Sequence, residues 1–398
     1  MNNPYESLNW RTALRVASTT HMHISTPWES PTPRAQIRLD NAYRHGLRHF
    51  PISNYYPSAP CLADTRLSDF RLRQAWPATR HGVPVPPPIN WNDLITWKDE
   101  LPEEIRRHLP FKETGPIFSR LPADVLLSKN AEHHSFTNMP CHVTAPGSAM
   151  CSGHFDARGQ FALPQHGYPL GYNGPWQDAF AEAFRCLDVP DGGGVVIAHP
   201  TWSRLSDAQV EEMLAFDPRV LGIEIYNDGV AIGIRNGRYP PEEGEPDPGY
   251  SIHMWDRILS KGRRCFGFCV PDHAIKEEGG WLGRVMLLPP AFTDADCLRA
   301  YRQGRFYACL KGSGLDVSDF AANPRRVAVT LNVPAHIKFI ADGRTAHTAK
   351  GFSAEWEIPL NDGAPAVTYV RVEVEDESGE RLFLQPVMYR GTDGQRLA

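Results

Sequence analysis

The stretch ASTTHMHIST (residues 17–26) places two histidines two residues apart, directly after a short apolar run. If residues 14–23 form a strand, side chains alternate between its faces, so His21 and His23 point the same way. Their backbones would then lie roughly 6.5–7 Å apart, which is close enough for both imidazoles to bind one ion. An isolated H-x-H pair is as typical of surface or capping histidines, so the rest of the chain has to decide between these interpretations.

The composition indicates a soluble globular protein. Of its 398 residues, 41% are hydrophobic and 22% are charged, with a net charge of −5. No basic run would follow a nucleic-acid backbone, and no stretch approaches about 18 consecutive apolar residues. The first ten residues do not look like a secretory signal, and the eight cysteines form no C-x-x-C pair, so we expect reduced, mostly buried thiols. We predict a cytoplasmic protein that acts on a small molecule. Nucleic acid and membrane are not expected partners, and homo-oligomerisation remains open.

Short apolar runs alternate with helical patterns through the first three quarters of the chain. This alternation is typical of β/α units with a parallel sheet. We therefore predict an α/β fold, a distorted (β/α)7 TIM-like barrel, over residues 1–312. The expected strands lie at 13–18, 47–53, 139–144, 194–198, 220–226, 264–270 and 284–288, and the expected helices at Trp176–Leu187, Asp207–Phe216 and His253–Lys261.

Two further regions differ from this pattern. Residues 313–398 contain short alternating runs separated by turns such as ADG and NDG, which predict a small antiparallel β-sandwich. We expect it to act as a structural cap or an oligomer surface, with sugar or partner binding as the alternative. Residues 55–130 are rich in proline, so we predict a long, partly irregular insertion with a short helix near Asp99–His108, which would cover the site as a lid.

Histidines and carboxylates recur where the predicted strands end. His142, His199 and the pair Asp272–His273 each follow or end a different strand, and Glu132 precedes the strand that carries His142. In a parallel barrel these ends meet at one face. Mixed imidazole and carboxylate ligands suit Zn²⁺, Mn²⁺ or Fe²⁺ better than Ca²⁺ or Mg²⁺, and a carboxylate such as Glu132 can bridge two cations.

In this order the motifs resemble a known family. H-x-H, a later glutamate, AHP (198–200) and a terminal Asp–His pair resemble the polymerase and histidinol phosphatase (PHP) domain of metal-dependent phosphoesterases. GIEIYN (222–227), WDRILSKGRRCFGFCVPDHA (255–274) and RQGRFYA (302–308), followed by a sandwich, are similar to its carbaryl-hydrolase-like branch. The resemblance covers roughly residues 10–312.

The resemblance implies a role for each matching residue. It implies that one metal ion is held by His21, His23, Glu132 and Asp272, and a second by His142, His199 and the bridging Glu132. His273 would lie near a third position or contact the substrate. The family usually has an aspartate where this chain has Trp28 and Glu29, and an Asp–His pair where it has Asn54 and Tyr55. These differences favour two metal ions over three, with Glu29 as an alternative ligand.

Other residues near these motifs are candidates for substrate contacts. We predict that Asn54, Tyr55, His134, Trp202 and Asn227 bind the substrate, and that Arg204 assists catalysis together with Asp272 and His273. Arg204 could grip a phosphate or carboxylate, or it could cap the following helix from the surface. At least one of His133 and His134 must face away from Glu132. Glu224 is interpreted as a satisfied acid of the barrel core.

Three functions are compatible with these residues. The first is a phosphoesterase that acts on a small phosphomonoester or phosphodiester through a metal-bound hydroxide at a binuclear site. The second is an amide, carbamate or ester hydrolase that uses the same ligands. The third is a non-catalytic binding protein with a degenerate site, against which the retained ligand set argues. We favour the first.

Overall fold

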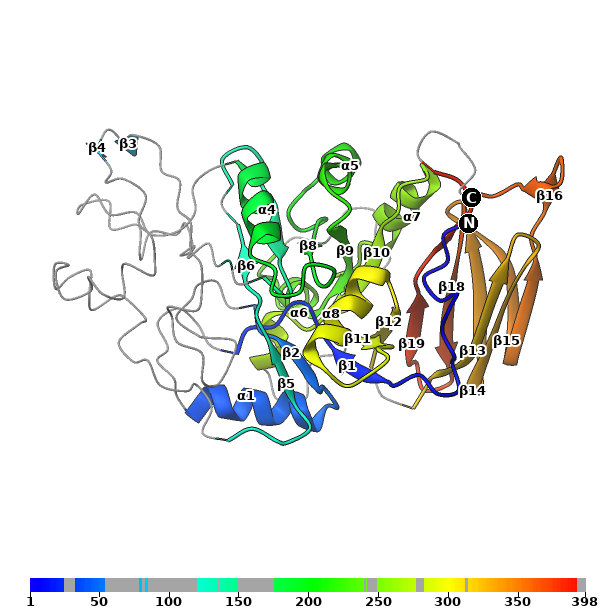
Figure 1. Cartoon of the computed structure of the whole chain (residues 1–398), viewed down its shortest axis with the longest axis horizontal. Coiled ribbons are helices and arrows are strands. Elements are labelled where there is room, and N and C mark those ends of the chain that lie inside the picture. The colour runs from blue at the N-terminus through cyan, green and yellow to red at the C-terminus, as the bar shows by residue number, and fades with distance from the viewer. Residues whose placement is uncertain are drawn as a thin grey trace.

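A computed structural model describes residues 1–24, 33–53, 120–134, 136–148, 150, 175–239, 241, 249–276, 283–311 and 314–391, and the backbone at 79–80 and 83–84. These residues form a mixed α/β structure (Figure 1) in which helices lie over a strand-rich centre and long antiparallel strands extend to one side. The N-terminus lies beside these long strands, where Asn2 pairs with Met388. No helix in the described part of the chain is long and apolar enough to cross a membrane.

The helices predicted at 176–187, 207–216 and 253–261 are present in the structure. Trp176 and Phe180 bury the apolar face of the first predicted helix, and Ser206 forms a capping box with Gln209 at the start of the second. The three predicted helices are confirmed to within a few residues. The described helices are α1 (Pro33–Arg44), α4 (Trp176–Arg185), α5 (Asp207–Phe216), α6 (Asp228–Arg235), α7 (Ile252–Ser260), α8 (Asp294–Gln303) and the short 3₁₀ helix η4 (His273–Lys276).

The smaller of two main sheets has the strand order β10-β9-β8-β7-β6. Its longest strand, β9, is buried along its whole length, and Glu224 is the one charged residue of that strand. Such a continuous apolar run is typical of a strand covered on both faces. The strands are β6 (Glu132–His133), β7 (His142–Thr144), β8 (Val195–Ala198), β9 (Val220–Asn227) and β10 (Phe266–Val270).

The larger sheet has the order β13-β14-β18-β19-β12-β11-β1-β2-β5, with β15 beside β14 and β20 beside β18. Short strand pairs join β3 (Thr79–Arg80) to β4 (Val83–Pro84) and β16 (Leu360–Asn361) to β17 (Ala364–Pro365). The sheet contains β1 (Val16–Ser18), β2 (His49–Pro51), β5 (Leu126–Ser128), β11 (Gly283–Leu287), β12 (Phe306–Leu310), β13 (Val317–Asn323), β14 (Arg326–Ala341), β15 (Arg344–Glu357), β18 (Tyr369–Asp376), β19 (Arg381–Leu384) and β20 (Val387–Met388).

The predicted TIM-like barrel is not found in this topology. All seven expected strands exist, but β1 pairs antiparallel with β11, and β7 pairs antiparallel with β8. The described strands hydrogen-bond into two main sheets and form no closed ring. The sequence pattern of a buried strand is the same whether the strand runs parallel or antiparallel to its neighbour. We predicted parallel strands because apolar runs alternate with helices, and the pairs β1–β11 and β7–β8 are antiparallel instead.

The C-terminal strands are antiparallel as predicted, and they share a hydrogen-bonded sheet with strands of the preceding region. They continue the larger sheet, because β19 pairs with β12 from the other side of the predicted boundary at residue 312. Their apolar core also takes in Tyr5 and Trp10 near the N-terminus. The Tyr5 hydroxyl donates to the Phe306 carbonyl and accepts from the backbone of Gln385. The larger sheet is therefore continuous across residue 312, and the predicted domain boundary at this residue stays a prediction.

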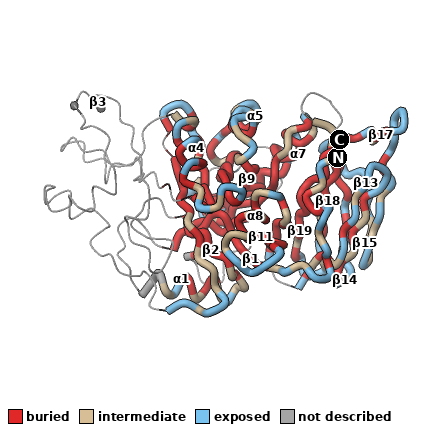
Figure 2. Tube along the Cα trace, in the orientation of Figure 1, coloured by how far each residue is buried: buried red, intermediate tan, exposed pale blue. Residues whose placement is uncertain are grey.

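The predicted proline-rich lid lies mostly outside the described residues, including Tyr55 and its proposed helix near residues 99–108. Its last part is different from the prediction. Residues 126–128 form β5, which pairs parallel to β2 and completes that edge of the larger sheet. The six described cysteines are free and buried, as expected from their spacing. The buried apolar residues form one cluster around the smaller sheet and its helices and another among the C-terminal strands, and Figure 2 colours buried residues red.

Candidate metal centre

The predicted ligands meet where strands of both sheets end. His21 and His23 follow β1, Glu132 begins β6, His199 follows β8 and Asp272 follows β10. The segments after β1 and β10 are joined directly, because the Asp272 backbone nitrogen donates to the His21 carbonyl at 3.0 Å. All five side chains are at least nine-tenths buried. Residues that are up to 251 positions apart in sequence (His21 to Asp272) therefore share one buried centre.

Four ligand atoms in this centre lie at almost equal distances. The two imidazole Nε2 atoms of His21 and His23 are 3.1 Å apart, which confirms that both side chains point the same way. Glu132 Oε2 lies 3.3 Å from His21 Nε2 and 3.0 Å from His23 Nε2. Asp272 Oδ1 lies 3.3 Å from each of the same two nitrogens.

This spacing fits a metal ion. In a tetrahedral site with bonds of about 2.0–2.1 Å, neighbouring ligand atoms are separated by about 3.3–3.4 Å. Two carboxylate oxygens of the set, Glu132 Oε2 and Asp272 Oδ1, are buried and accept no hydrogen bond from the described residues. A buried carboxylate oxygen without a partner is costly unless a cation satisfies it. His21, His23 and Asp272 form one group that could hold a metal.

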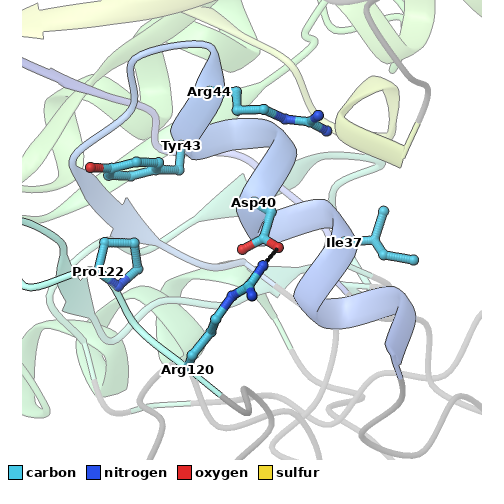
Figure 3. A pocket seen from close by; sticks show the side chains of 6 residues that line it. All are labelled: Ile37, Asp40, Tyr43, Arg44, Arg120 and Pro122. Carbon is cyan, nitrogen blue, oxygen red and sulfur yellow. Dashed lines mark hydrogen bonds and ion pairs between the residues drawn. The ribbon is translucent and has the colours of Figure 1, made fainter.

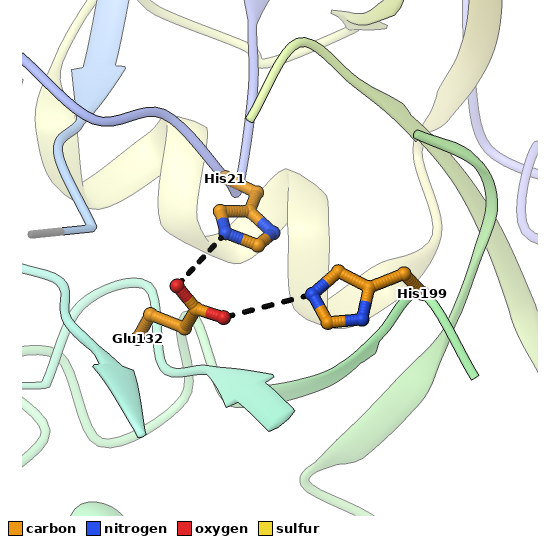
Figure 4. Close-up of side chains that lie close together, drawn as sticks. All are labelled: His21, Glu132 and His199. Atoms are coloured by element: carbon orange, nitrogen blue, oxygen red, sulfur yellow. Dashed lines mark ion pairs between the residues drawn. The ribbon is translucent and has the colours of Figure 1, made fainter. Parts of the chain in front are cut away.

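A second group forms on the other side of Glu132. His21, Glu132 and His199 have ligand atoms close enough to hold a metal (Figure 4). Glu132 Oε1 lies 3.6 Å from His199 Nε2 and 2.8 Å from His142 Nδ1, so its two oxygens face different histidines. His142 is at the start of β7, not at its end as predicted. It reaches the centre because the antiparallel β7 places His142 opposite Ala198, the last residue of β8.

Two of the candidate ligands have a strained backbone. His199 has a φ of 27° and Asp272 a φ of 50°, in the left-handed region that residues with a Cβ rarely adopt. Such strain persists where surrounding contacts hold it, and it is concentrated at functional sites. Asp272 is also closely packed, because a Cβ on Gly229 would come within 2.9 Å of Asp272 Oδ2. Only glycine therefore fits at position 229 beside this carboxylate.

The charges of the centre shift one another's pKa. Burial alone would lower the pKa of His21, but the negative charges of Asp272, Glu224 and Glu132 raise it well above its ordinary value. Burial alone would raise the pKa of Glu132 and of Asp272, but the neighbouring His21 lowers both well below their ordinary values. The metal-free centre therefore keeps its carboxylates ionised and binds a proton on His21 instead.

Sequence reasoning missed the part played by Glu224. This side chain is fully buried in β9, and its Oε1 lies 2.7 Å from His21 Nδ1. Its Oε2 accepts from the His199 backbone nitrogen and from Asn227 Nδ2, both at 2.8 Å. The signal was a single carboxylate inside the apolar run GIEIYN, which an acid cannot occupy without strong donors around it.

Rings form a partly exposed wall at the edge of the centre. The His142 and His134 rings stack at 4.4 Å, and Trp202 meets the rings of His142 and His199 edge-on at 5.4 and 4.8 Å. Tyr239, which was not predicted, continues the wall 5.4 Å beyond Trp202.

His273 lies on the other side of the centre. Its ring stacks on His23 at 4.1 Å, and its side chain is 42% exposed. The predicted positions of His134, Trp202 and His273 beside the ligands are therefore consistent with substrate contact.

Other predicted residues are placed differently. Arg204 is exposed, and its predicted role in catalysis stays a prediction. Asn227 is buried, and its amide bonds Glu224 at one end and caps α6 through Val230 at the other. It therefore supports the ligands and does not face a substrate. Asn54, Tyr55 and the alternative ligand Glu29 lie outside the described residues.

Two other features lie apart from the ligands. Ser18, His49 and Asp294 form a hydrogen-bonded row, but the Ser18 hydroxyl is fully buried and already bonds His49 and Tyr301, so no substrate can reach it. A cavity of about 420 Å³ lies along α1 (Figure 3). It is lined by Ile37, Asp40, Tyr43, Arg44, Arg120 and Pro122, none of which belongs to the centre.

No family model matches the chain, and no curated protein matches it. Among solved structures it is similar to a two-domain protein from Bacteroides vulgatus ATCC 8482 described as containing a predicted PHP-like metal-dependent phosphoesterase. The two are 14% identical, with 91% of this chain and 90% of the other covered, at a TM-score of 0.40. A likeness at this level does not establish a shared function, and the carbaryl-hydrolase-like branch stays a prediction. What this chain itself displays is a buried His/Glu/Asp centre that could bind metal.

Proposed function

We propose that this protein is a metal-dependent hydrolase that cleaves a small phosphomonoester or phosphodiester. The observation that carries the proposal is the set of four ligand atoms from His21, His23, Glu132 and Asp272, which lie 3.0–3.3 Å apart in five of their six pairs. Two of these atoms are buried carboxylate oxygens that accept no hydrogen bond within the described structure. A divalent transition metal satisfies both, and mixed histidine and carboxylate ligation favours Zn²⁺, Mn²⁺ or Fe²⁺.

We further propose two ions per chain. Glu132 supports this, because its Oε2 faces His21 and His23 while its Oε1 faces His142 and His199. A carboxylate with both oxygens so directed can bridge two cations. When bound, such ions lower the pKa of a water ligand and stabilise negative charge that develops on a phosphoryl oxygen.

The protein's own side chains supply the remaining functions. His273, half exposed beside His23, is in place to exchange a proton with a substrate. The wall of His134, Trp202 and Tyr239 offers ring surfaces to an apolar or aromatic part of the substrate. A small molecule bound at the ligands would then lie between this wall and His273.

The proposal is tested by loading the purified protein with Mn²⁺ or Zn²⁺, counting the bound metal and screening small phosphoesters. We expect about two equivalents per chain, and activity that a chelator abolishes and added metal restores. Less than one equivalent after supplementation would contradict the metal centre. A loaded protein that is inert on phosphoesters but cleaves aryl carbamates, amides or carboxylic esters would replace the phosphoesterase assignment by the alternative hydrolase, with the same residues as ligands.

Metal affinity is expected to fall as the pH falls from 8 to 6. The pKa of His21 in the metal-free centre is raised above its ordinary value, so a proton occupies this imidazole at pH values where most histidines are neutral. Metal must displace that proton, so each proton displaced weakens the apparent affinity about tenfold per pH unit. Calorimetric titration in buffers of different protonation enthalpy measures both the affinity and the protons released. An affinity that is constant between pH 6 and 8 would contradict the expectation.

A further inference from the structure

We propose that Glu224 is a positioning residue that sets the metal-binding atom of His21 and the backbone of His199 at the same time. The inference rests on the proposed metal centre but concerns a residue that binds no metal itself. Glu224 belongs to β9, its carboxylate contacts His21, and its side chain is completely buried. Its three hydrogen-bond partners among the described residues are His21, the His199 backbone and Asn227, which belong to the centre or support it.

The hydrogen bonds of Glu224 determine which nitrogen of His21 faces the ligands. Glu224 Oε1 is 2.7 Å from His21 Nδ1, and an ionised carboxylate can only accept. Nδ1 must therefore carry a proton in either protonation state, so Nε2 is the nitrogen that faces Glu132 and Asp272 and that can bind metal once its own proton is displaced. A carboxylate that orients a metal-binding histidine in this way usually raises the affinity of the site.

The second oxygen of Glu224 holds the strained end of β8. Oε2 accepts from the backbone N–H of His199, whose φ is 27°. Because this conformation is unfavourable for a residue with a Cβ, a strong hydrogen bond at its nitrogen helps to hold the imidazole in place. One side chain thus couples a member of each of the two candidate metal groups.

Asn227 makes a carboxylate necessary at position 224. Its Oδ1 accepts from the Val230 backbone nitrogen at the start of α6, so its amide nitrogen is turned toward Glu224. Glu224 therefore faces three donors, and flipping the Asn227 amide would break the helix cap. A glutamine at 224 can accept at only one end, and its own NH₂ would meet at least one of these donors.

The test compares full-length wild-type protein with Glu224→Gln, using Zn²⁺ and a competing chelator. We expect the variant to bind Zn²⁺ about 10–100-fold more weakly than wild type, the usual effect of losing such a partner. Glu380→Gln is the matched control. Glu380 is also a buried carboxylate that accepts two backbone N–H groups, from Gly314 and Leu315, but it lies among the C-terminal strands. Equal affinity in wild type and Glu224→Gln, or an equal loss in the control, would overturn the proposal.

A second measurement uses wild-type protein, so it does not depend on whether the Glu224→Gln variant folds. In wild-type protein labelled with ¹⁵N-histidine and loaded with Zn²⁺, long-range ¹H–¹⁵N spectra identify the nitrogen that carries the proton. We expect His21 to bind through Nε2 and to keep its Nδ1 proton, with the signal assigned by its loss in His21→Gln. Coordination through Nδ1 would overturn the inference even though metal is bound. Wild-type protein that binds no Zn²⁺ would instead overturn the proposed function, and this inference with it.

Discussion

Replacement of Glu132 by glutamine is expected to lower the hydrolytic rate at least about 100-fold, as damage to a metal centre does. Its Oε2 lies within 3.3 Å of both His21 and His23, and its Oε1 contacts the histidines on the other side. A glutamine keeps the shape but loses the charge, and its NH₂ would point at one set of nitrogens. Steady-state rates at saturating Mn²⁺ or Zn²⁺ measure the effect, and we expect His199→Ala to lower activity by a similar factor.

His133 provides the matched control for Glu132. It is the next residue of β6, is equally buried, and neither ring nitrogen has a hydrogen-bond partner among the described residues. Burial lowers its pKa to about 4, so it is neutral at physiological pH. His133→Phe should therefore keep near wild-type activity and metal content. Near wild-type turnover in Glu132→Gln at saturating metal would show that Glu132 is not a ligand.

Replacement of Arg371 by methionine is expected to lower the free energy of unfolding by about 3–5 kcal/mol. The Arg371 guanidinium is 1% exposed, and it bonds both oxygens of Asp256 at 2.7 Å. It also bonds Glu373 at 2.5 Å and lies over the ring of Trp255. Removing the cation would leave two carboxylates, largely buried, without their charge partner, where helix α7 packs on the C-terminal strand β18.

Urea denaturation followed by far-UV circular dichroism measures this loss. Arg326→Met is the control, because Arg326 makes a single ion pair with Glu355 in the same part of the sheet but is half exposed. Ion pairs that are open to solvent contribute about 0–1 kcal/mol. The double replacement Arg371→Met with Asp256→Leu should recover part of the lost stability, because no charge then remains unpaired on the helix. A loss below about 1 kcal/mol in Arg371→Met would mean that the cluster does not hold these elements together.

Much of the ligand set could be predicted from local sequence. His21 and His23 point the same way because side chains two apart share a face of extended chain, and the 3.1 Å between their nitrogens confirms it. The apolar runs that end in His199 and Asp272 form β8 and β10 because a buried strand needs a continuous apolar sequence. These features depend on residues within a few positions of one another, so they are visible without the fold.

Tertiary packing decided how these pieces are combined. The direction of β7 relative to β8 brings His142 to Glu132 from the start of its strand, and no pattern within β7 encodes that direction. The pairing of β12 with β19 makes one sheet of two stretches that differ in sequence character. Strand direction and strand partners are set by which apolar faces bury each other across the whole chain, and local periodicity contains no information on that choice.

The case of Glu224 shows the same division most clearly. The local sequence GIEIYN (222–227) shows only that an acid lies within an apolar strand. Any buried carboxylate that is surrounded by hydrogen-bond donors would have the same local sequence. The donors come from His21, 203 residues earlier, and from the backbone of His199, 25 residues earlier. Local sequence thus determined that an acid would be buried at this position. Only the convergence of three distant segments decided that it would contact Nδ1 of His21, because a hydrogen bond requires two atoms within about 3 Å regardless of their separation along the chain.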